Sequence, residues 1–351
     1  MAGIREVANL AGVSISTVSN VMNNRKFVRE DLREKVLSAA KKLDYEADAI
    51  ARGLKACRTR TLGVIIKSFN RIFFPQVLNG MQVIANELGY TLITHSTDDD
   101  YNKEKDFVKM LINNRVDGIV ISTVADPRND DYFKYLSNLA IKSKRVPVIS
   151  EGHDLTKYGI HSVFVDNYLG GRLMTQHLTE LGAREIVHIG GPVSSEMFIK
   201  RFQGYKDVLM ENGIPFRQLL TTNGDFSPLS GYTALKRLIV MGIPFDAVFA
   251  DNDQMAIGAM KCLKENNFDI PNDIKLAGFD NTFVASIIKP SLTTIHVPKH
   301  KLGALSIKNL IDVIEGNIEE GRVIREELPV ELICRQSTCP DVKDDWDLEY
   351  W

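Results

Sequence analysis

Near the N-terminus, apolar residues recur at the spacing of an amphipathic helix. They are Ile4, Val7, Ala8 and Ala11. This spacing predicts a helix over residues 4–11. Gly12 follows, where helix ends favour a residue that tolerates a left-handed backbone. Ser14 is a good N-cap, because its hydroxyl can accept a hydrogen bond from a free amide of the next turn. A second helix is therefore expected from Ser14 to about Met22, and a third at about 30–43.

From residue 61 onwards, runs of Val and Ile alternate with amphipathic segments. Strands are expected at 62–66, 90–96, 117–123, 146–150, 162–166, 185–191, 246–251, 274–280, 292–297 and 328–333. Helices are expected between them, at 74–88, 102–114, 167–181, 199–212, 228–241, 252–266 and 298–315. Apolar strands separated by helices are typical of parallel sheets covered on both faces. Small ligands bind such sheets at the carboxyl ends of the strands.

The elements predict an all-α head and an α/β body with two lobes, each built on a parallel sheet. The chain crosses back between the lobes near residue 293. The expected parts are a helix-turn-helix domain at 1–47, a hinge helix and linker at 48–60, an effector-binding and dimerisation body at 61–340, and an acidic aromatic tail at 341–351. The N-lobe is expected at about 61–165 and 294–325, and the C-lobe at about 166–293 and 326–340.

Composition excludes several classes of protein. The 351 residues are 44% apolar and 25% charged, which is typical of a soluble globular protein. No run approaches the roughly 20 apolar residues of a membrane helix, and the N-terminus lacks the pattern of a secretory signal. The four scattered cysteines are too few for a disulfide framework. We therefore expect a cytoplasmic protein.

Charge is distributed unevenly along the chain. The net charge is −2, but residues 1–60 carry 12 Lys and Arg against 7 Asp and Glu. The head is therefore +5 and the remainder −7. A basic head on an acidic body suggests a polyanion as the partner of the head. A solvated helical surface is the alternative, and charge alone does not decide between them.

The first two helices and their glycine-containing turn have the pattern of a helix-turn-helix. In this motif the second helix can lie in the major groove of DNA. Its outward side chains are mostly short and able to hydrogen-bond, which suits contacts to base edges and phosphates. They are Ile15, Ser16, Thr17, Ser19 and Asn20. A plain three-helix bundle without a ligand is the alternative.

The head resembles the DNA-binding head of the LacI/GalR family of bacterial transcription regulators. That family has the pattern VAxxAGVS followed by xxTVSxVxN, and this chain has VANLAGVS and ISTVSNVMN. The likeness continues through REKVLSAAKKLDYEADAIARGL into the family's third helix and hinge. In the body it covers FVDNYLGG, HIGGP, RFQGY, ADNDQMAIGA, GFDN and PSLTTIHVPKHKLG. The resemblance implies a sequence-specific regulator, by preference a repressor, of carbohydrate-uptake or catabolism genes.

The resemblance implies roles for individual residues of the head. Ile15 and Ser16 would meet base edges, and Asn20 occupies the family's third base-reading position, where many relatives carry Arg. Asn favours an adenine edge and Arg favours guanine. The other DNA-binding candidates of the head are Ser14, Thr17, Ser19 and Asn23. For Thr17 and Ser19 a solvated helix position is the alternative.

Residues 48–56, DAIARGLKA, are the second expected DNA element. Arg52 and Lys55 supply cations, while Gly53 weakens a helix by roughly 1 kcal/mol relative to Ala. So short a helix is marginal alone in water. The resemblance implies that it orders on operator binding, as a pair from two subunits, with Leu54 as the wedge that opens a base step. A linker with a stray leucine is the alternative.

Polar residues follow several predicted strands of the body, where a pocket would form. Asp280 and Asn252 follow two strands, and Arg201 opens the helix with RFQGY. With the aromatic Phe226, these groups suit a polyhydroxylated ligand such as a sugar. The resemblance aligns all four with effector contacts. It adds Phe73, Phe74, Glu151 and Asp166 as further cleft-lining positions. A cap or surface role is the alternative for each, and for Asn252 a helix cap is at least as good an interpretation.

The class of ligand is less sharply indicated. The head and the pair Phe73–Phe74 are similar to the purine-repressor branch of the family. However, Ser195 and Met197 stand where that branch places polar contacts to the base. A sugar or sugar derivative is therefore favoured. The carboxylate of Glu151 disfavours a carboxylated sugar, and the cation of Arg201 could offset that effect. The alternatives are another small ligand, or a phosphorylated carrier-protein corepressor of the kind used by catabolite control proteins, which the ending RQST resembles.

Enzymatic patterns are missing from the sequence. It has no GxxxxGK[ST] loop and no GxSxG elbow. The histidines show no metal-ligand spacing, and Cys334 and Cys339 are five apart without a second pair, so no zinc site is predicted. We expect no enzyme, no cofactor and no metal. A sugar-binding protein and an α/β enzyme are the alternatives to a regulator.

The expected mechanism combines these parts. A homodimer binds a pseudo-palindromic operator, because two-fold protein symmetry demands a near two-fold site. An effector in the cleft changes whether the two hinge helices can pack together. No heptad run follows the body, so a zipper-held tetramer is not indicated.

The tail has five acids against one lysine, with both tryptophans; a disordered tail and a docked strand both remain open.

Overall fold

The structure is a computed structural model of the chain, and it describes residues 3–23, 27–45, 58–141 and 144–343. The chain folds into two compact units, Met1–Arg60 and Thr61–Trp351. We call them the head and the body and describe each by itself. Within the described ranges, no helix is both long enough and apolar enough to cross a membrane.

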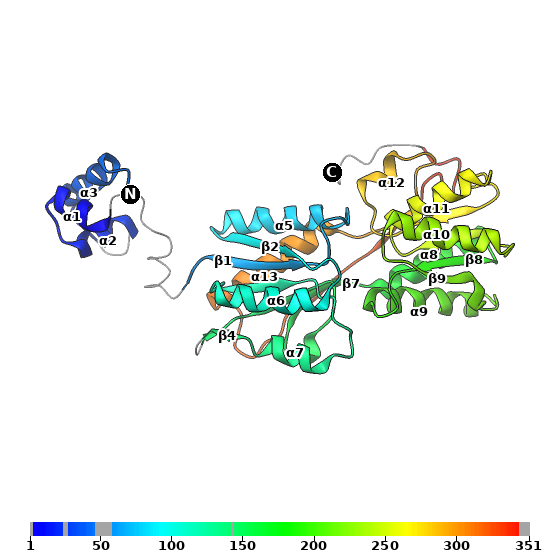
Figure 1. Cartoon of the computed structure of the whole chain (residues 1–351), viewed down its shortest axis with the longest axis horizontal. Coiled ribbons are helices and arrows are strands. Elements are labelled where there is room, and N and C mark those ends of the chain that lie inside the picture. Colours follow the sequence, from blue (N-terminus) through cyan, green and yellow to red (C-terminus); the bar gives the residue numbers. More distant parts are fainter. Residues whose placement is uncertain (1–2, 24–26, 46–57, 142–143, 344–351) are drawn as a thin grey trace. The chain divides into compact units, whose positions relative to one another are not determined.

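The described part of the head contains three helices, as predicted for these residues (Figure 1). They are α1 (Ile4–Ala11), α2 (Ile15–Asn23) and α3 (Glu30–Lys42). Gly12 ends α1 with φ of 66°, a conformation that glycine adopts without strain. The Ser14 hydroxyl accepts a hydrogen bond from the Thr17 amide at 3.1 Å, so the predicted cap of α2 is confirmed. The short turn between these two helices is the turn of a helix-turn-helix.

The core of the head is small and draws on all three helices. Its buried residues are Val7, Ala8, Val18, Val21, Val36, Ala39 and Ala40. Met22, Leu32 and Leu43 are half-exposed, because they lie at the margin of so small a core. Helix packing therefore leaves the outward face of α2 at the surface.

The first lobe of the body is built on a six-stranded sheet in the order β13-β7-β6-β3-β1-β2. All its strand pairs are parallel. The strands are β1 (Thr61–Ile66), β2 (Thr91–Ser96), β3 (Gly118–Ile121), β6 (Val148–Glu151), β7 (His161–Val165) and β13 (Arg325–Leu328). The helices are α5 (Phe74–Glu87), α6 (Tyr101–Asn113), α7 (Asp130–Ser137) and α13 (Lys299–Glu315). The sheet carries helices on both faces (Figure 1).

Strand β1 shows why the apolar run was continuous. Val64 and Ile66 belong to the cluster that includes α5 and α13, whereas Ile65 belongs to the cluster that includes α6 and α7. Successive side chains of a strand point to opposite faces. A strand covered on both faces must therefore be apolar at every position.

The second lobe is built on a four-stranded parallel sheet in the order β11-β10-β8-β9. The strands are β8 (Ile186–Gly190), β9 (Thr221–Asn223), β10 (Ala247–Ala250) and β11 (Lys275–Ala277). The helices are α8 (Asn167–Glu180), α9 (Glu196–Glu211), α10 (Pro228–Val240), α11 (Asp253–Glu265) and the short α12 (Phe283–Ile287). The two parallel sheets confirm the predicted fold class. Helix α9 begins three residues before the expected start, and β9 and α12 were not predicted.

Three segments of chain connect the lobes. They lie between β7 and α8, between β12 (Thr294–His296) and α13, and between β13 and β14 (Glu331–Ile333). β12 and β14 pair antiparallel in a sheet of their own. The segment expected as one strand at 328–333 is thus divided: β13 remains in the first sheet until Leu328, a few residues beyond the expected boundary at 325. The pair β4 (Ala140–Ile141) and β5 (Lys144–Arg145) was not predicted.

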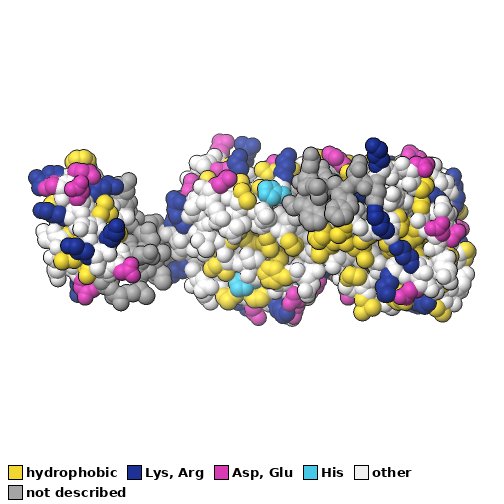
Figure 2. Space-filling view, turned by 90° about the horizontal axis from the view of Figure 1, so that it is seen from above, with side chains coloured by type: hydrophobic (Ala, Val, Ile, Leu, Met, Phe, Trp, Pro, Cys, Tyr) yellow, Lys and Arg dark blue, Asp and Glu magenta, His cyan; other side chains and the backbone are white. Residues whose placement is uncertain are grey.

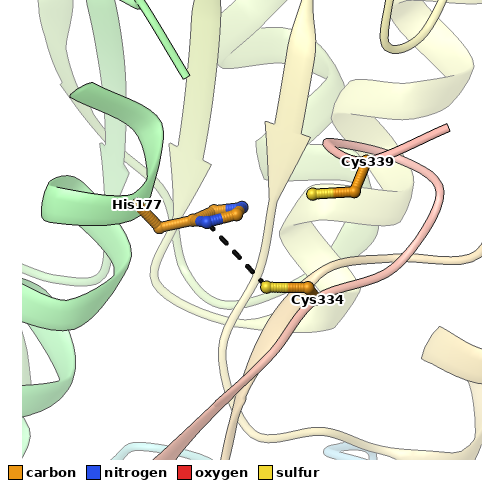
Figure 3. Close-up of side chains that lie close together, drawn as sticks. All are labelled: His177, Cys334 and Cys339. Carbon is orange, nitrogen blue, oxygen red and sulfur yellow. Dashed lines mark hydrogen bonds between the residues drawn. The ribbon is translucent and has the colours of Figure 1, made fainter. Parts of the chain in front are cut away.

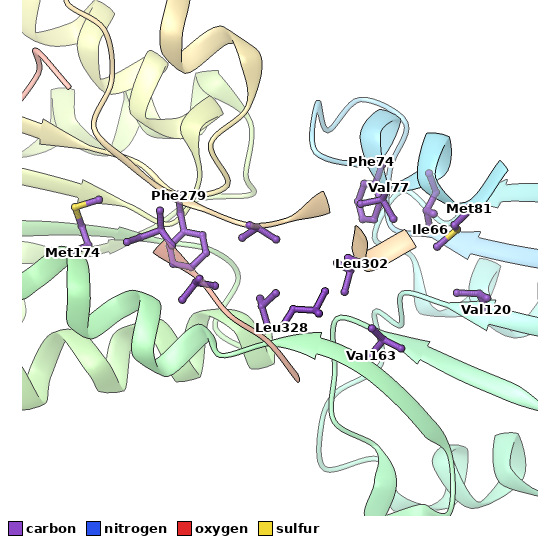
Figure 4. Packing of buried hydrophobic residues seen from close by; sticks show 14 of the residues in the cluster. Ile66, Phe74, Val77, Met81, Val120, Val163, Met174, Phe279, Leu302 and Leu328 are labelled. Atoms are coloured by element: carbon purple, nitrogen blue, oxygen red, sulfur yellow. The ribbon is translucent and has the colours of Figure 1, made fainter. Parts of the chain in front are cut away.

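One apolar cluster extends through both lobes (Figure 4). Met174 and Phe279 contribute from the second lobe, and Ile66 and Phe74 from the first. Leu328, at the end of β13, is a further member of the cluster. The connecting segments are therefore part of a core that is continuous between the two lobes.

Candidate effector cleft and DNA-binding head

A pocket lies where the strands of both sheets end at their carboxyl termini. It encloses about 620 Å³ of empty space when its open mouth is included, and residues of both lobes line it. Charged and amide residues lie one to three positions beyond the ends of β1, β7, β10 and β11, as the sheet topology requires. The polar and charged lining residues are Lys67, Arg71, Ser122, Glu151, Asn167, Arg201, Asn252 and Asp280.

Seven of the eight residues expected at the effector site line this pocket. They are Phe73, Phe74, Glu151, Arg201, Phe226, Asn252 and Asp280. The eighth, Asp166, is not among the lining residues. Its carboxylate accepts a hydrogen bond from the Leu169 amide at 2.8 Å and caps α8. For Asp166 the alternative of a helix cap is therefore the observed role.

A buried ion pair occupies the side of the pocket formed by the second lobe. Arg201 Nε donates to Asn167 Oδ1 at 2.9 Å, Nη1 donates to the Asp251 carbonyl, and Nη2 lies 3.9 Å from Asp280 Oδ1. The guanidinium also lies 3.5 Å from the centroid of the Phe279 ring. Burial raises the pKa of Asp280 to about 7, against the opposing effect of Arg201. The pocket therefore keeps a carboxyl group that can accept or donate a hydrogen bond near neutral pH.

A second charged group occupies the side formed by the first lobe. Lys67 Nζ lies 3.2 Å from His153 Nε2. Burial raises the pKa of Glu151 to about 7, and the nearby Lys67 opposes the shift. Burial, followed by the charge of Arg71, lowers the pKa of Lys67 to about 8. Because an ammonium group only donates, His153 accepts through Nε2, and its Nδ1 lies 3.4 Å from a carboxylate oxygen of Glu196 in the other lobe.

The aromatic ring of the pocket is held by a glycine and an amide. A Cβ at Gly191 would lie 2.2 Å from Phe226 Cζ, so only glycine admits the ring. Phe226 has φ of 68°, and Asn252 Nδ2 donates to its carbonyl at 3.0 Å. Asn252 Oδ1 accepts from the Met255 amide and caps α11. Arg71 lies 4.4 Å from the ring centroid, so one face of Phe226 is covered by a guanidinium.

Hydrogen bonds between the lobes show that the cleft is closed. Gln254 of α11 accepts a hydrogen bond from the Ile72 amide at 3.0 Å and donates to the Asn70 carbonyl at 3.3 Å. The loop that carries Asn70 and Ile72 belongs to the first lobe and also presents Arg71, which pairs with Asp99. The loop thus joins the mouth of the pocket to the second lobe.

Three polar lining residues of the first lobe were not predicted from the sequence: Lys67, Arg71 and Ser122. Lys67 and Ser122 come directly after β1 and β3, and this position after a strand end was the signal that could have identified them. Within the described ranges, the buried Ser122 hydroxyl has no hydrogen-bond partner. A buried polar group without a partner costs free energy, so a ligand that pairs with it would be favoured.

The outward face of α2 carries the expected DNA-contact residues of the head. Ile15 is 45% exposed, Ser16 is also exposed, and Thr17, Ser19 and Asn20 are half-exposed. Lys and Arg side chains are spread over the described surface of the head, with acids between them (Figure 2). The Asn23 side chain and the hinge candidates Arg52, Leu54 and Lys55 lie outside the described residues.

Comparisons with family models and known proteins agree along the chain. Residues 3–48 match the model of bacterial regulatory proteins of the lacI family, and residues 175–338 match a periplasmic binding protein-like domain. The HTH-type transcriptional repressor PurR of Vibrio cholerae serotype O1 (strain M66-2) is 33% identical over 96% of this chain and 98% of its own length. The regulator RegA of Clostridium saccharobutylicum is 32% identical over 95% and 98%.

Two solved structures show the same architecture. The lac repressor dimer bound to operator and the anti-inducer ONPF has a TM-score of 0.85 and 29% identity, over 96% of this chain and 99% of that one. The complex of the transcriptional regulator CelR with cellobiose has a TM-score of 0.69 and 27% identity, over 96% and 100%.

A helix-turn-helix head and a two-lobed body with a polar cleft define a DNA-binding regulator controlled by a small effector. The chain belongs to the LacI family of bacterial regulatory proteins. It is a DNA-binding transcriptional repressor under effector control and not an enzyme. The family, the fold class and the general function predicted from the sequence are thereby confirmed.

Proposed function

We propose that this repressor controls genes of carbohydrate uptake or catabolism, and that a sugar or sugar derivative in the cleft sets its affinity for the operator. The repressor acts in the bacterial cytoplasm as a homodimer on a pseudo-palindromic operator. The observation that carries the proposal is the lining of the pocket, which brings carboxyl, amide, guanidinium and hydroxyl groups together with aromatic rings.

The polar lining matches the requirements of a ligand with many hydroxyl groups. Each hydroxyl both donates and accepts a hydrogen bond. Asp280 and Glu151 offer acceptors, Arg201 and Lys67 offer donors, and the Ser122 hydroxyl can do either. A flat ligand with few polar edges would leave the buried Ser122 hydroxyl without a partner, at a cost of roughly 1–3 kcal/mol.

The aromatic lining supports the same class of ligand. Phe226 and Phe73 present apolar surface that can cover the CH groups of a sugar ring. A ring that stacks on the face of Phe226 covered by Arg71 must displace that guanidinium. The displaced Arg71 can then donate to oxygen atoms of the ligand, which favours oxygen-rich sugars and their phosphorylated or acidic derivatives.

The DNA side of the proposal rests on α2 and the hinge. Ile15, Ser16 and Asn20 are proposed to meet base edges in the major groove. Phosphate and minor-groove contacts are assigned to the remaining candidates, namely Ser14, Thr17, Ser19, Asn23, Arg52, Leu54 and Lys55. The lac repressor, of similar fold, has been solved as a dimer bound to operator, which supports the two-fold arrangement.

The hydrogen bonds between the lobes suggest how the ligand signal is transmitted. Gln254 bonds to the Asn70 and Ile72 backbone, and His153 faces Glu196, beside the pocket lining. A ligand that binds between these groups changes the relative stability of the closed and open lobes. By linkage, it then shifts operator affinity if the two arrangements of the lobes differ in DNA binding.

A thermal-shift assay of the full chain tests the proposed effector class. The panel contains neutral sugars, sugar phosphates and purines. Stabilisation by one of the first two groups supports the proposal, whereas stabilisation by purines alone would refute it. Asp280→Asn should remove the shift, and Asp131→Asn, at an exposed position of α7, serves as the matched control and should retain it. If operator binding required a phosphorylated carrier protein and was unaffected by every sugar, that protein would be favoured as the corepressor instead.

A further inference from the structure

Outside the cleft, a histidine and two cysteines converge from distant segments (Figure 3). His177 lies in the last turn of α8, Cys334 directly follows β14, and Cys339 comes directly after the segment RQST that follows Cys334. The imidazole nitrogen and the two sulfur atoms all lie within 4.8 Å of one another. His177 Nδ1 lies 3.8 Å from Cys334 Sγ.

These distances suit a tetrahedral metal ion. Zinc binds thiolate at about 2.3 Å and imidazole at about 2.0–2.1 Å, which at the tetrahedral angle places two sulfurs about 3.8 Å apart and nitrogen about 3.6 Å from sulfur. The observed 3.8 Å between His177 Nδ1 and Cys334 Sγ is close to this value. The two cysteines have four residues between them, a spacing typical of structural zinc ligands.

The hydrogen bonds behind His177 orient its ring. Thr293 Oγ1 donates to the Arg335 carbonyl at 3.0 Å and lies 2.6 Å from Thr338 Oγ1. The Thr338 hydroxyl proton has two acceptors, Thr293 Oγ1 and Cys339 Sγ at 3.6 Å, so the Thr338 oxygen accepts from His177 Nε2 at 2.8 Å. In this assignment Nε2 carries the proton and Nδ1 directs its lone pair toward Cys334. A hydrogen-bond acceptor that fixes the tautomer of a ligating histidine is the usual outer arrangement of metal sites.

Two of the three candidate ligands are partly exposed to solvent. His177 is buried, whereas Cys334 and Cys339 are half-buried and reach solvent on one side. A water molecule can therefore complete a four-coordinate site. Two thiolates with one imidazole form a soft donor set, which favours zinc over magnesium or calcium.

We propose that His177, Cys334 and Cys339 bind one zinc ion, with water in the fourth position. The ion connects the end of α8 to the segment that follows β14. That segment follows β14, which comes directly after the connection between β13 and β14 that joins the lobes. Zinc would therefore stabilise the chain next to this connection, on the second lobe. The spacing of the cysteines alone predicts no such site, because the third ligand lies 157 positions earlier in the chain.

A zinc titration of the reduced, metal-free full chain tests the proposal. Competition with a chromophoric chelator should give one zinc ion per chain. Cobalt as a substitute should give a thiolate-to-metal charge-transfer band. Cys334→Ser, Cys339→Ser and His177→Gln should each weaken zinc binding by at least about 100-fold. Cys57→Ser and Cys262→Ala are matched controls at the other two cysteines and should bind as the wild type does.

A second measurement on the unaltered chain guards against variants that fail to fold. Zinc should protect Cys334 and Cys339 from alkylation, as mapped by mass spectrometry, and should leave the alkylation of Cys57 unchanged. Absence of stoichiometric zinc binding would overturn the proposal. So would equal protection of all cysteines, or a disulfide between Cys334 and Cys339 in the reduced preparation in place of bound zinc.

Discussion

The head and the cleft place their candidate contact residues in opposite ways. In the head, the expected base contacts come from one helix of nine residues, α2, whose outward side chains are exposed or half-exposed. In the cleft, 16 residues between Lys67 and Leu302 line one pocket, and its charged groups are largely buried. The head therefore depends on a local sequence pattern, whereas the cleft depends on the topology of two sheets.

This difference has energetic consequences. Exposed side chains of α2 can be exchanged with little effect on stability, because surface substitutions are usually within about 0.5 kcal/mol. Buried charges such as Arg201 and Asp280 support one another, so removing one partner disturbs both folding and ligand binding. Recognition of DNA can thus change independently of the fold, and recognition of the effector cannot.

The largest expected effect comes from breaking the core of the head. Val18 is fully buried on α2, and Val18→Asp places a charge in a core of seven buried residues, which costs several kcal/mol. Operator affinity, measured by fluorescence anisotropy, should fall at least about 1,000-fold. The thermal transition of the body and its response to ligand should persist. Loss of both would show that the two units do not fold separately.

The next largest effect is expected at the buried ion pair of the cleft. Arg201→Ala should lower the free energy of unfolding of the body by about 3–5 kcal/mol, because it leaves Asp280 buried without its cation. It should also abolish the ligand-induced thermal shift. Urea denaturation measures the first effect. The double variant Arg201→Ala/Asp280→Asn should recover part of the stability without recovering ligand binding; wild-type stability of the single variant would contradict this account.

A moderate and purely local effect is expected at the recognition helix. Asn20→Arg should change the preferred base at one position of each half-site from adenine to guanine, with about 1–3 kcal/mol of discrimination. Binding to a panel of single-base operator variants measures the preference. Effector affinity and the thermal stability of the body should not change. An unchanged base preference would remove Asn20 from the set of base-reading residues.

The smallest effect concerns the pH dependence of stability. The pKa of Glu151 is raised to about 7 in the folded body, so the folded state holds this proton more tightly than the unfolded state does. The contribution of Glu151 to stability is therefore present at low pH and is lost as pH rises from about 4.5 to 7. The difference in unfolding free energy between wild type and Glu151→Gln should fall by at least about 1 kcal/mol over this range. If the difference in unfolding free energy between the two proteins did not change with pH, the raised pKa of Glu151 and the burial that causes it would be contradicted.

The fold could be predicted largely from local patterns, and the site only in part. Glycine at position 12 and serine at 14 define the head by short-range chemistry, and Val and Ile runs define the buried strands. By contrast, nothing in the local sequence shows that Arg71 would cover Phe226, since the two lie on different lobes. Asp166 shows the converse: a carboxylate after a strand caps the next helix instead of entering the pocket.

The glycines of HIGGP show how a motif can have a meaning that its spacing does not reveal. The spacing of the glycines in HIGGP is not that of a nucleotide-binding loop. Gly191 instead leaves space for the Phe226 ring. The cluster of His177, Cys334 and Cys339 is a second case, because its third member comes from a helix far away in sequence. In both, the tertiary contact decides the function of the residue.

The central claim is that a ligand in the cleft controls the affinity of the head for its operator. The most direct test begins with DNA selected from a random pool by the full chain. Operator affinity is then titrated with and without a saturating ligand from the thermal-shift panel. We expect a near-palindromic operator whose affinity changes at least about tenfold, corresponding to about 1.4 kcal/mol of coupling. A ligand that binds the cleft and leaves the operator affinity unchanged would contradict the account.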